Sequence, residues 1–202
     1  MAAVLSLFVC LSACDKDDEH SVRGEVSPMG EEGAYVDITN FGMFAGRATV
    51  VSLDDGISSY TFQGQVPNAN LRNILSNRPG VTIDGENVTI SDFRVRNTVK
   101  GIEVISGLGH PGVIAHYDAK VGDTYSMGGT SRVRTVVSRS IDNDFSWGGM
   151  LIRAIQVEEP NRSHGIKKTT YWANHRWGLV GVEFTYEDDS SVYFPLFFNT
   201  SN

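Results

Sequence analysis

Short runs in which apolar and polar residues alternate are the feature that most restricts how this chain can fold. Such runs recur through the second half of the sequence, separated by short polar segments such as Glu159-Pro160-Asn161 and Asp188-Asp189-Ser190. Alternation with a period of two indicates strands that bury one face, and short turns at regular spacing indicate antiparallel neighbours. We therefore expect an all-β chain of antiparallel meander sheets, curved as a half-barrel or stacked as a sandwich, with one short helix.

The pattern places the expected strands in two groups. In the first half they are Ala34–Ile38, Arg47–Leu53, Ile57–Gln63 and Asn87–Arg96. In the second half they are Val121–Tyr125, Arg132–Ser140, Met150–Glu158, Gly165–Asn174, Trp177–Tyr186 and Ser191–Phe198. The alternation slips by one residue near Asp92, which indicates a β-bulge. Asp54-Asp55-Gly56 and Asp84-Gly85 are typical hairpin turns. Residues 67–75 have helical spacing and predict the short helix.

The first thirteen residues form an uncharged, mostly apolar run that ends just before Cys14. A helix that crosses a bilayer needs about 20 apolar residues, so this run is too short to be a transmembrane anchor. Its length matches the apolar part of a secretory signal, and Ser12 and Ala13 are small, as a signal peptidase requires before its cleavage site. We expect residues 1–13 to be a signal peptide.

The residues around this cleavage site resemble the lipobox of bacterial lipoproteins. Leu11-Ser12-Ala13-Cys14 has a large aliphatic residue, two small residues and then the cysteine. The resemblance implies cleavage before Cys14, diacylglycerol on its sulfur and an acyl chain such as palmitate on the new N-terminus. Two or more acyl chains anchor a protein stably to a membrane, whereas one does not.

The next segment, Asp15 to Glu19, resembles the acidic export signal of surface lipoproteins in Gram-negative Bacteroidetes. Lys16, Asp17 and Asp18 match the lysine and the pair of acids in that signal. Together the two resemblances imply a lipid-anchored protein of the outer membrane that faces the cell exterior. The alternative from the residues alone is a buried N-terminal strand followed by a solvated run of charges.

Length, charge and cysteine content set further limits. The 202 residues suffice for a signal peptide over residues 1–13, an acylated tether over 14–21, an N-terminal β sub-domain with the short helix over 22–112 and a C-terminal meander sub-domain over 113–202. The net charge of −7 includes four acids and one lysine in the tether, so the body is mildly acidic and we expect no nucleic-acid partner. Cys10 and Cys14 are the only cysteines, so the mature body has no disulfide and no cysteine-bound metal.

A segment in the second half carries another resemblance. Tyr171–Val180 is similar to the "YYA…GxGLV" segment of several β-rich bacterial lipoproteins, in which it follows a strand like Tyr117–Tyr125. Those sheets are open, curved half-barrels, and some hold lipid-like ligands. The resemblance implies the fold and not an activity, because one fold serves many functions.

No motif in the sequence predicts a catalytic residue, a metal site or a cofactor. The histidines lack metal-ligand spacing, the acidic segment 142–146 lacks the glycine and glutamate of a calcium loop, and no serine lies in a nucleophile elbow. A pair of carboxylates for glycoside hydrolysis is the enzymatic alternative. The acids available for it are Glu103, Asp118, Glu158 and Glu183.

Aromatic residues are the best candidates for ligand binding. Trp147 lies in a Ser-Trp-Gly-Gly turn, and Trp172 and Trp177 flank His175. An exposed tryptophan suits stacking on a sugar ring or packing on a partner protein. We expect Trp172 to pack in the core and Trp147 to be the more exposed residue.

The sequence thus favours a lipid-anchored surface protein whose non-catalytic binding module takes a glycan or an outer-membrane protein partner. One alternative is a carrier that encloses an apolar or lipid-like ligand in a half-barrel cavity. The other is a carbohydrate-active hydrolase.

Overall fold

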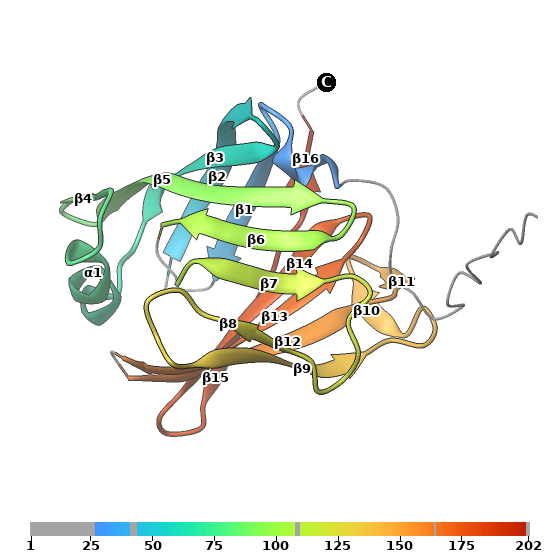
Figure 1. Cartoon of the computed structure of the whole chain (residues 1–202). Coiled ribbons are helices and arrows are strands. Elements are labelled where there is room, and N and C mark those ends of the chain that lie inside the picture. Colours follow the sequence, from blue (N-terminus) through green and yellow to red (C-terminus); the bar gives the residue numbers. More distant parts are fainter. Residues whose placement is uncertain (1–26, 41–43, 108–109, 164, 201–202) are drawn as a thin grey trace, which may run out of the picture.

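The computed structural model describes residues 27–40, 44–107, 110–163 and 165–200 (Figure 1). The expected signal peptide, the lipobox with Cys14 and the export signal with Lys16, Asp17 and Asp18 lie outside the described residues. The chain folds as an all-β structure of antiparallel sheets that include a curled half-barrel, with one short α-helix, as the alternation predicts. No helix in the described part of the chain has the length and apolarity needed to cross a bilayer.

The first sheet is built mainly from the first half of the chain. Within the described residues it has eight strands in the order β16-β1-β2-β3-β5-β6-β7, with β4 paired to β5. The strands are β1 (Tyr35–Asn40), β2 (Phe44–Asp54), β3 (Ile57–Gln65), β4 (Val81–Asp84), β5 (Asn87–Thr98), β6 (Gly101–Ser106), β7 (Gly112–His116) and β16 (Phe198–Asn199). Asp92 has a φ of 63° where the register between β3 and β5 shifts, which confirms the bulge.

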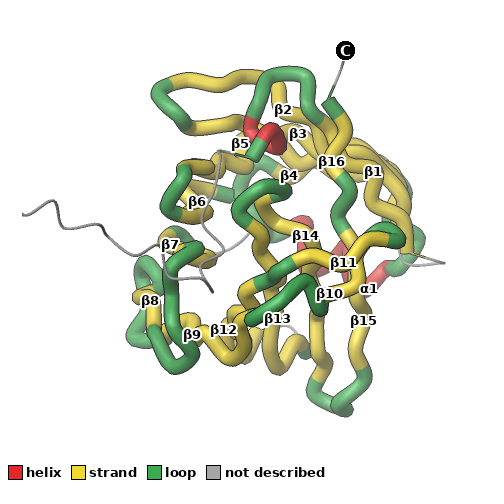
Figure 2. The backbone as a smooth tube through the Cα atoms, turned by 90° about the vertical axis from the view of Figure 1, so that its right-hand side faces the viewer, coloured by secondary structure: helices red, strands yellow, loops and turns green. Residues whose placement is uncertain are grey.

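The second sheet is the meander that the sequence predicts. Its described strands follow the order β15-β14-β13-β12-β9-β8, and a separate hairpin of β10 and β11 lies between β9 and β12 in the sequence. The strands are β8 (Thr124–Ser126), β9 (Val133–Arg139), β10 (Phe145–Trp147), β11 (Met150–Ile152), β12 (Ile155–Ser163), β13 (Ile166–Asn174), β14 (Gly178–Tyr186) and β15 (Ser191–Pro195). Figure 2 shows the β10–β11 hairpin at the β13–β15 side of the molecule.

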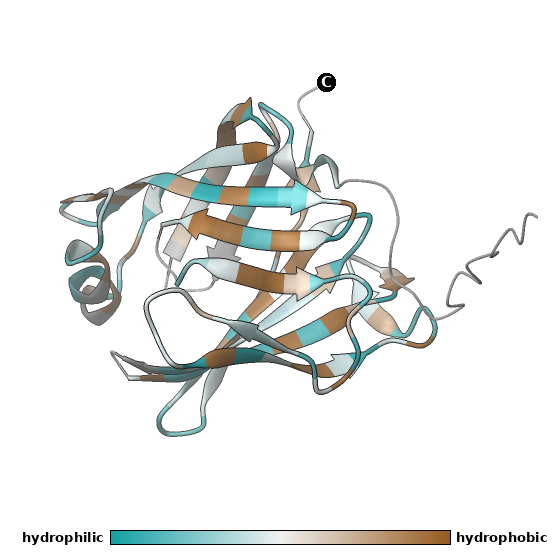
Figure 3. Cartoon of the chain, viewed as in Figure 1, coloured by the Kyte–Doolittle hydropathy of each residue, from teal (hydrophilic) through white to brown (hydrophobic). Residues whose placement is uncertain are grey.

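One hydrophobic core lies between the two sheets. Its buried residues from the first sheet include Tyr60, Ile102 and Ile114, and those from the second include Ile155 and Val157. Bands of apolar and polar residues alternate along the strands of both sheets (Figure 3), because each strand turns one side towards this core. The expected division into sub-domains at residue 112 remains a prediction, although both sheets share this core.

A short 3₁₀-helix, η1 (Pro28–Gly30), joins the sheets at one end of the core. The hydroxyl of Tyr60 on β3 donates a hydrogen bond to the Met29 carbonyl at 2.8 Å. The Met29 side chain is buried against β14, where the Leu179 N–H lies 3.2 Å from its sulfur. A Cβ at Gly178 would lie 1.8 Å from that sulfur, so this position requires glycine.

Helix α1 (Ala69–Ser76) covers a smaller apolar cluster of the first sheet. Asn68 caps it, since its side chain accepts a hydrogen bond from the Leu71 N–H at 2.9 Å. Leu71 and Leu75 pack on the buried residues Val88 and Ile90. The helix predicted at residues 67–75 is thereby confirmed, one or two residues later in the chain.

Two predicted strands are each divided in the structure. Met150–Glu158 is β11 and β12 with a break between them, because Ala154 exchanges hydrogen bonds with Ser140 instead of continuing the hairpin. Ser191–Phe198 is β15 in the second sheet and β16 in the first. Both breaks fall inside mostly apolar runs, residues 150–155 and 192–198, so the sequence pattern does not reveal them. The strands β4, β6, β7 and β10 were not among the predicted ones.

Candidate ligand-binding face

The outer face of the second sheet, which points away from the shared core, carries two rows of directly opposite residues. The core side of these strands is taken by Ile155, Val157 and Ala173, so the positions between them point outward. The first row crosses five strands and consists of Ser138, Gln156, Trp172, Gly181 and Pro195. The second row consists of Thr135, Glu158, Thr170, Glu183 and Tyr193. We call this surface the outer face.

Three aromatic rings pack together on the outer face. Phe145 of the β10–β11 hairpin stacks against Trp172 of β13, with ring centroids 6.1 Å apart and an interplanar angle of 23°. Tyr193 of β15 packs edge to face against the same indole, with ring centroids 5.2 Å apart and an interplanar angle of 88°. The Tyr193 side chain crosses over Gly181 to reach the indole. A Cβ at that position would lie 2.5 Å from the Tyr193 hydroxyl, so the glycine leaves room for the tyrosine. Tyr193 is 38% exposed, so the group presents an aromatic surface to solvent.

A shallow depression lies beside Trp172, between β10 and the first row. Its volume is about 140 Å³. It is lined by Ser138, Arg139, Ser140, Asp144, Phe145, Ala154, Gln156 and Trp172. A register of directly opposite residues brings Ser138 and Gln156 next to Trp172, and the hairpin supplies Asp144 and Phe145.

Trp147 is not the exposed tryptophan that its glycine-rich turn suggested. It is only 6% exposed, and its indole N–H donates a hydrogen bond to the Leu196 carbonyl at 3.1 Å. Its ring lies 5.4 Å from that of Trp177 and 5.2 Å from that of Phe197. The two glycines let the hairpin turn back on itself, and this fold drives Trp147 under the hairpin towards β14. The exposure prediction for Trp147 is therefore wrong.

The structure brings all three tryptophans into one apolar cluster. Trp147 is buried there with Ile152 and Val180, and Trp172 and Trp177 pack against them half-buried. His175 lies next to Trp177 in the turn between β13 and β14. The four sequence-predicted ligand residues are thus neighbours, but Trp147 anchors the hairpin while Trp172 borders the depression.

The turn that holds His175 has a positive environment. Asn174 shapes the turn, since its side-chain oxygen accepts hydrogen bonds from the backbone N–H groups of Arg176 and Trp177. The Arg176 guanidinium lies 4.9 Å above the Trp177 ring. Partial burial of His175 and the charges of Arg153 and Arg176 lower the pKa of its imidazole. These surroundings favour the neutral form of the imidazole over the charged form.

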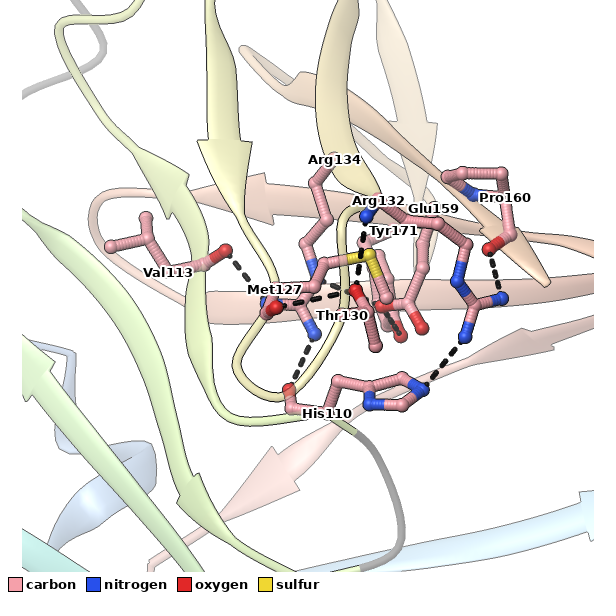
Figure 4. A network of polar contacts seen from close by, with 9 residues as sticks. All are labelled: His110, Val113, Met127, Thr130, Arg132, Arg134, Glu159, Pro160 and Tyr171. Carbon is pink, nitrogen blue, oxygen red and sulfur yellow. Dashed lines mark hydrogen bonds and ion pairs between the residues drawn. The ribbon is translucent and has the colours of Figure 1, made fainter.

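A buried polar network lies on the opposite, core-facing side of the second sheet (Figure 4). Arg134 of β9 is 1% exposed and forms an ion pair with Glu159 of β12, with 2.7 Å between Nε and Oε2. Its terminal nitrogens donate to the carbonyls of Val113 at 2.9 Å and His110 at 2.7 Å. The hydroxyl of Tyr171 donates to the same glutamate oxygen at 3.1 Å.

This network has a structural role. Arg134 ties strand β7 and the residues before it, which belong to the first sheet, to the second sheet. Burial and the charge of Glu159 raise the pKa of Tyr171 well above its usual range, so its hydroxyl stays protonated and donates. His110 contacts Arg132 through its Nε2 atom at 2.9 Å. Its position therefore serves the junction of the sheets.

The sequence also left open a metal site and a pair of catalytic carboxylates. Among the described residues, no three His, Cys, Asp or Glu side chains are grouped as ligands of a metal ion would be. Of the four candidate carboxylates, Glu103 pairs with Arg96 at 2.8 Å, and Glu158 pairs with Lys168 at 2.5 Å. Each has a cation as neighbour on its own sheet face.

Reasoning from the sequence did not identify several residues of the outer face as candidates for ligand binding. Phe145, Tyr193, Gln156, Asp144 and Ser138 all lie around Trp172 in the structure. The alternation already places Gln156 and Tyr193 on the outward side of their strands. The signal that was lacking is the register between strands, which decides which outward residues become neighbours.

Comparison with known proteins adds no family to these observations. The sequence matches no protein-family model, and comparison with curated proteins and with solved structures finds no match.

Proposed function

We propose that this protein is a lipid-anchored binding module of the bacterial cell exterior that holds glycans on the outer face without transforming them. The single observation that carries the proposal is the aromatic group of half-buried Phe145 and Trp172 with exposed Tyr193, which lies beside polar side chains. Aromatic rings bury the apolar faces of sugars, and neighbouring polar groups fix the orientation of the hydroxyls.

The anchoring part of the proposal comes from the sequence. A lipobox-like Leu11–Cys14 followed by the acidic segment 15–19 supports acylation of Cys14 and transfer to the outer surface. An anchor at the N-terminal end and a binding face on the second sheet would let the protein hold extracellular material close to the membrane.

The two alternatives receive less support. A carrier needs an apolar cavity, and ligand cavities usually measure about 300–1,000 Å³. The space between the sheets is filled by buried side chains such as Tyr117, Ile155 and Val157. A hydrolase needs two carboxylates in a cleft. Glu158 and Glu183 lie two strands apart, on an open sheet face with Thr170 between them.

Glycan binding is tested by affinity electrophoresis of the full chain in gels that contain soluble polysaccharides. Trp172→Ala and Tyr193→Ala should each lose most of the retardation that the wild type shows. Tyr35→Ala is the matched control, since it removes an aromatic ring from the first sheet. Equal retardation of all four proteins would contradict glycan binding at the outer face, and retention by a partner protein alone would favour the protein-ligand alternative.

Anchoring is tested separately in the native host. Cys14→Ser should shift the protein from the membrane fraction to the soluble fraction and abolish incorporation of a labelled fatty acid. Protease added to intact cells should degrade the wild type if it faces outward. Membrane association that is unaffected by Cys14→Ser would contradict the lipid anchor without affecting the binding result.

A further inference from the structure

We infer that the depression beside Trp172 is a subsite for one neutral sugar ring, and that the glycan continues from it across Trp172 towards Tyr193. The inference rests on the proposed function and assigns it a ligand class and a set of recognition residues. It depends on three properties of the depression: its size, its unpaired polar groups and the charges around it.

The size fits a single ring. The depression has a volume of about 140 Å³. A closed protein cavity of about 150 Å³ holds one benzene molecule, so the open depression has room for about one six-membered ring and cannot enclose a long lipid chain. Phe145 and Trp172 form one wall, which provides an apolar contact for the face of the ring.

The polar groups around the depression are uncommitted. Among the described residues, the side chains of Ser138, Asp144 and Gln156 have no hydrogen bond or ion pair, and they come from three different elements, β9, the turn before β10 and β12. Together they offer a hydroxyl, a carboxylate and an amide, which donate and accept in the ways that adjacent sugar hydroxyls need. A few polar groups that converge beside an aromatic wall are the usual composition of a ligand site.

The charges select a neutral ligand. Arg139 also lines the depression and brings a positive charge to it, while its Nη1 donates to the Ala119 carbonyl at 3.3 Å. Glu158 is paired with Lys168. Asp144 and Glu183 remain as carboxylates without an ion pair among the described residues. The charge of Glu183 and partial burial both raise the pKa of Tyr193, with burial the larger cause. The depression itself thus holds one cation and one carboxylate, which suits a neutral ring, and Glu183 further along the path disfavours a carboxylate-bearing sugar.

The path from the depression to Tyr193 is longer than one ring. Gln156 lies on β12 and Tyr193 on β15, which are three strand spacings apart, or about 14 Å. Trp172 lies between them and contacts Tyr193. A glycan of several units can therefore place one ring in the depression and further units over Trp172 and Tyr193.

The experiment is a titration calorimetry panel on the full chain with four neutral polysaccharides, an α-glucan, a β-glucan, a mannan and a galactan, and one acidic polysaccharide, pectate. The variants are Gln156→Leu, which replaces the amide by an apolar group, and Asp144→Asn, which removes the charge and keeps the side-chain shape. Gln63→Leu, the same exchange at an exposed residue of β3 in the first sheet, is the matched control. Circular dichroism verifies that each variant is folded.

We expect the wild type to bind at least one neutral polysaccharide, and Gln156→Leu and Asp144→Asn each to weaken that binding about tenfold. Gln63→Leu should bind like the wild type. Unchanged affinity in both depression variants, with binding still lost in Trp172→Ala, would overturn this inference while the proposed function stands. Binding of pectate alone would overturn the neutral class. Absence of binding to every polysaccharide would overturn the proposed function as well.

Discussion

Arg134 and Glu159 form a buried charged pair within the second sheet, and Arg134 also connects that sheet to the first. Both side chains are almost completely buried, and the guanidinium also holds two backbone carbonyls from the segment around β7. Removing one partner of a buried pair leaves an uncompensated charge, which costs far more than the pair contributes when intact.

We therefore expect Glu159→Ala to lower the free energy of unfolding by about 3–5 kcal/mol. The control is Glu103→Ala, which breaks the half-exposed pair with Arg96 and should cost about 0–1 kcal/mol. Denaturation in urea measures both. A double variant, Arg134→Met with Glu159→Leu, should recover part of the loss, because it leaves no buried charge without a partner. The recovery should be incomplete, since the carbonyls of His110 and Val113 still lack their donor. Equal effects of the two single variants would contradict this assignment.

His175 makes the stability of the fold depend on pH. Its pKa is lowered in the folded protein by burial, Arg153 and Arg176, so the unfolded chain takes up the proton first as the pH falls. The stability that His175 contributes is therefore fully present above its unfolded pKa, near 6.5, and is lost as the pH falls towards the lower folded value. As the pH falls from about 7.5 to about 5.5, the free energy of unfolding of His175→Gln should therefore rise relative to that of the wild type. Urea midpoints at both pH values measure this difference, and a difference that does not change with pH would contradict it.

At the scale of the element, the β10–β11 hairpin is held against the meander by Trp147. The indole is buried against Trp177 and Phe197 and bonded to the Leu196 carbonyl, whereas Leu151 on the same hairpin is 62% exposed. The hairpin also supplies Phe145 and Asp144 to the depression, so its attachment determines whether the binding face exists.

Trp147→Ala should lower the free energy of unfolding by about 3–5 kcal/mol, because it removes a buried indole. It should also make residues 142–152 sensitive to limited proteolysis. Leu151→Ala, on the exposed side of the hairpin, should change stability by no more than about 0.5 kcal/mol. Stability of Trp147→Ala close to that of Leu151→Ala would show that the hairpin is attached in another way.

Much of the fold follows from the sequence, and the elements explain the limit. Alternation predicted the meander strands, and the bulge at Asp92 and the hairpin turn at Asp55 also followed from local patterns. Residues 192–198 form a continuous apolar run while the chain leaves one sheet for the other, so the local pattern carries no information on the crossing. The candidate site depended on register, and only Trp172 of its aromatic group was predicted.

At the scale of the whole molecule, the shared core couples the two sheets. All three tryptophans lie in the second half of the chain, so their fluorescence reports on the second sheet. Ile102 on β6 of the first sheet is buried in the core that both sheets form. A defect placed in one sheet should therefore be detected in the other.

Ile102→Ala should lower the stability measured by tryptophan fluorescence by about 2–5 kcal/mol, and the fluorescence and far-ultraviolet dichroism curves should coincide. Val99→Ala, in the exposed turn between β5 and β6, is the control. Separate transitions for the two signals, or an unchanged fluorescence midpoint in Ile102→Ala, would mean that the sheets unfold independently.

The pairing of β16 with β1 has a consequence for biosynthesis. Asn199 and Phe198 are the partners of Tyr35 and Val36. A nascent chain leaves the ribosome with β1 long before β16 has been translated, and meanwhile the backbone groups at that end of β1 are open to any other strand. A product that stops after residue 195 would keep this edge open permanently. Such a fragment should self-associate, while a chain that includes β16 closes the edge.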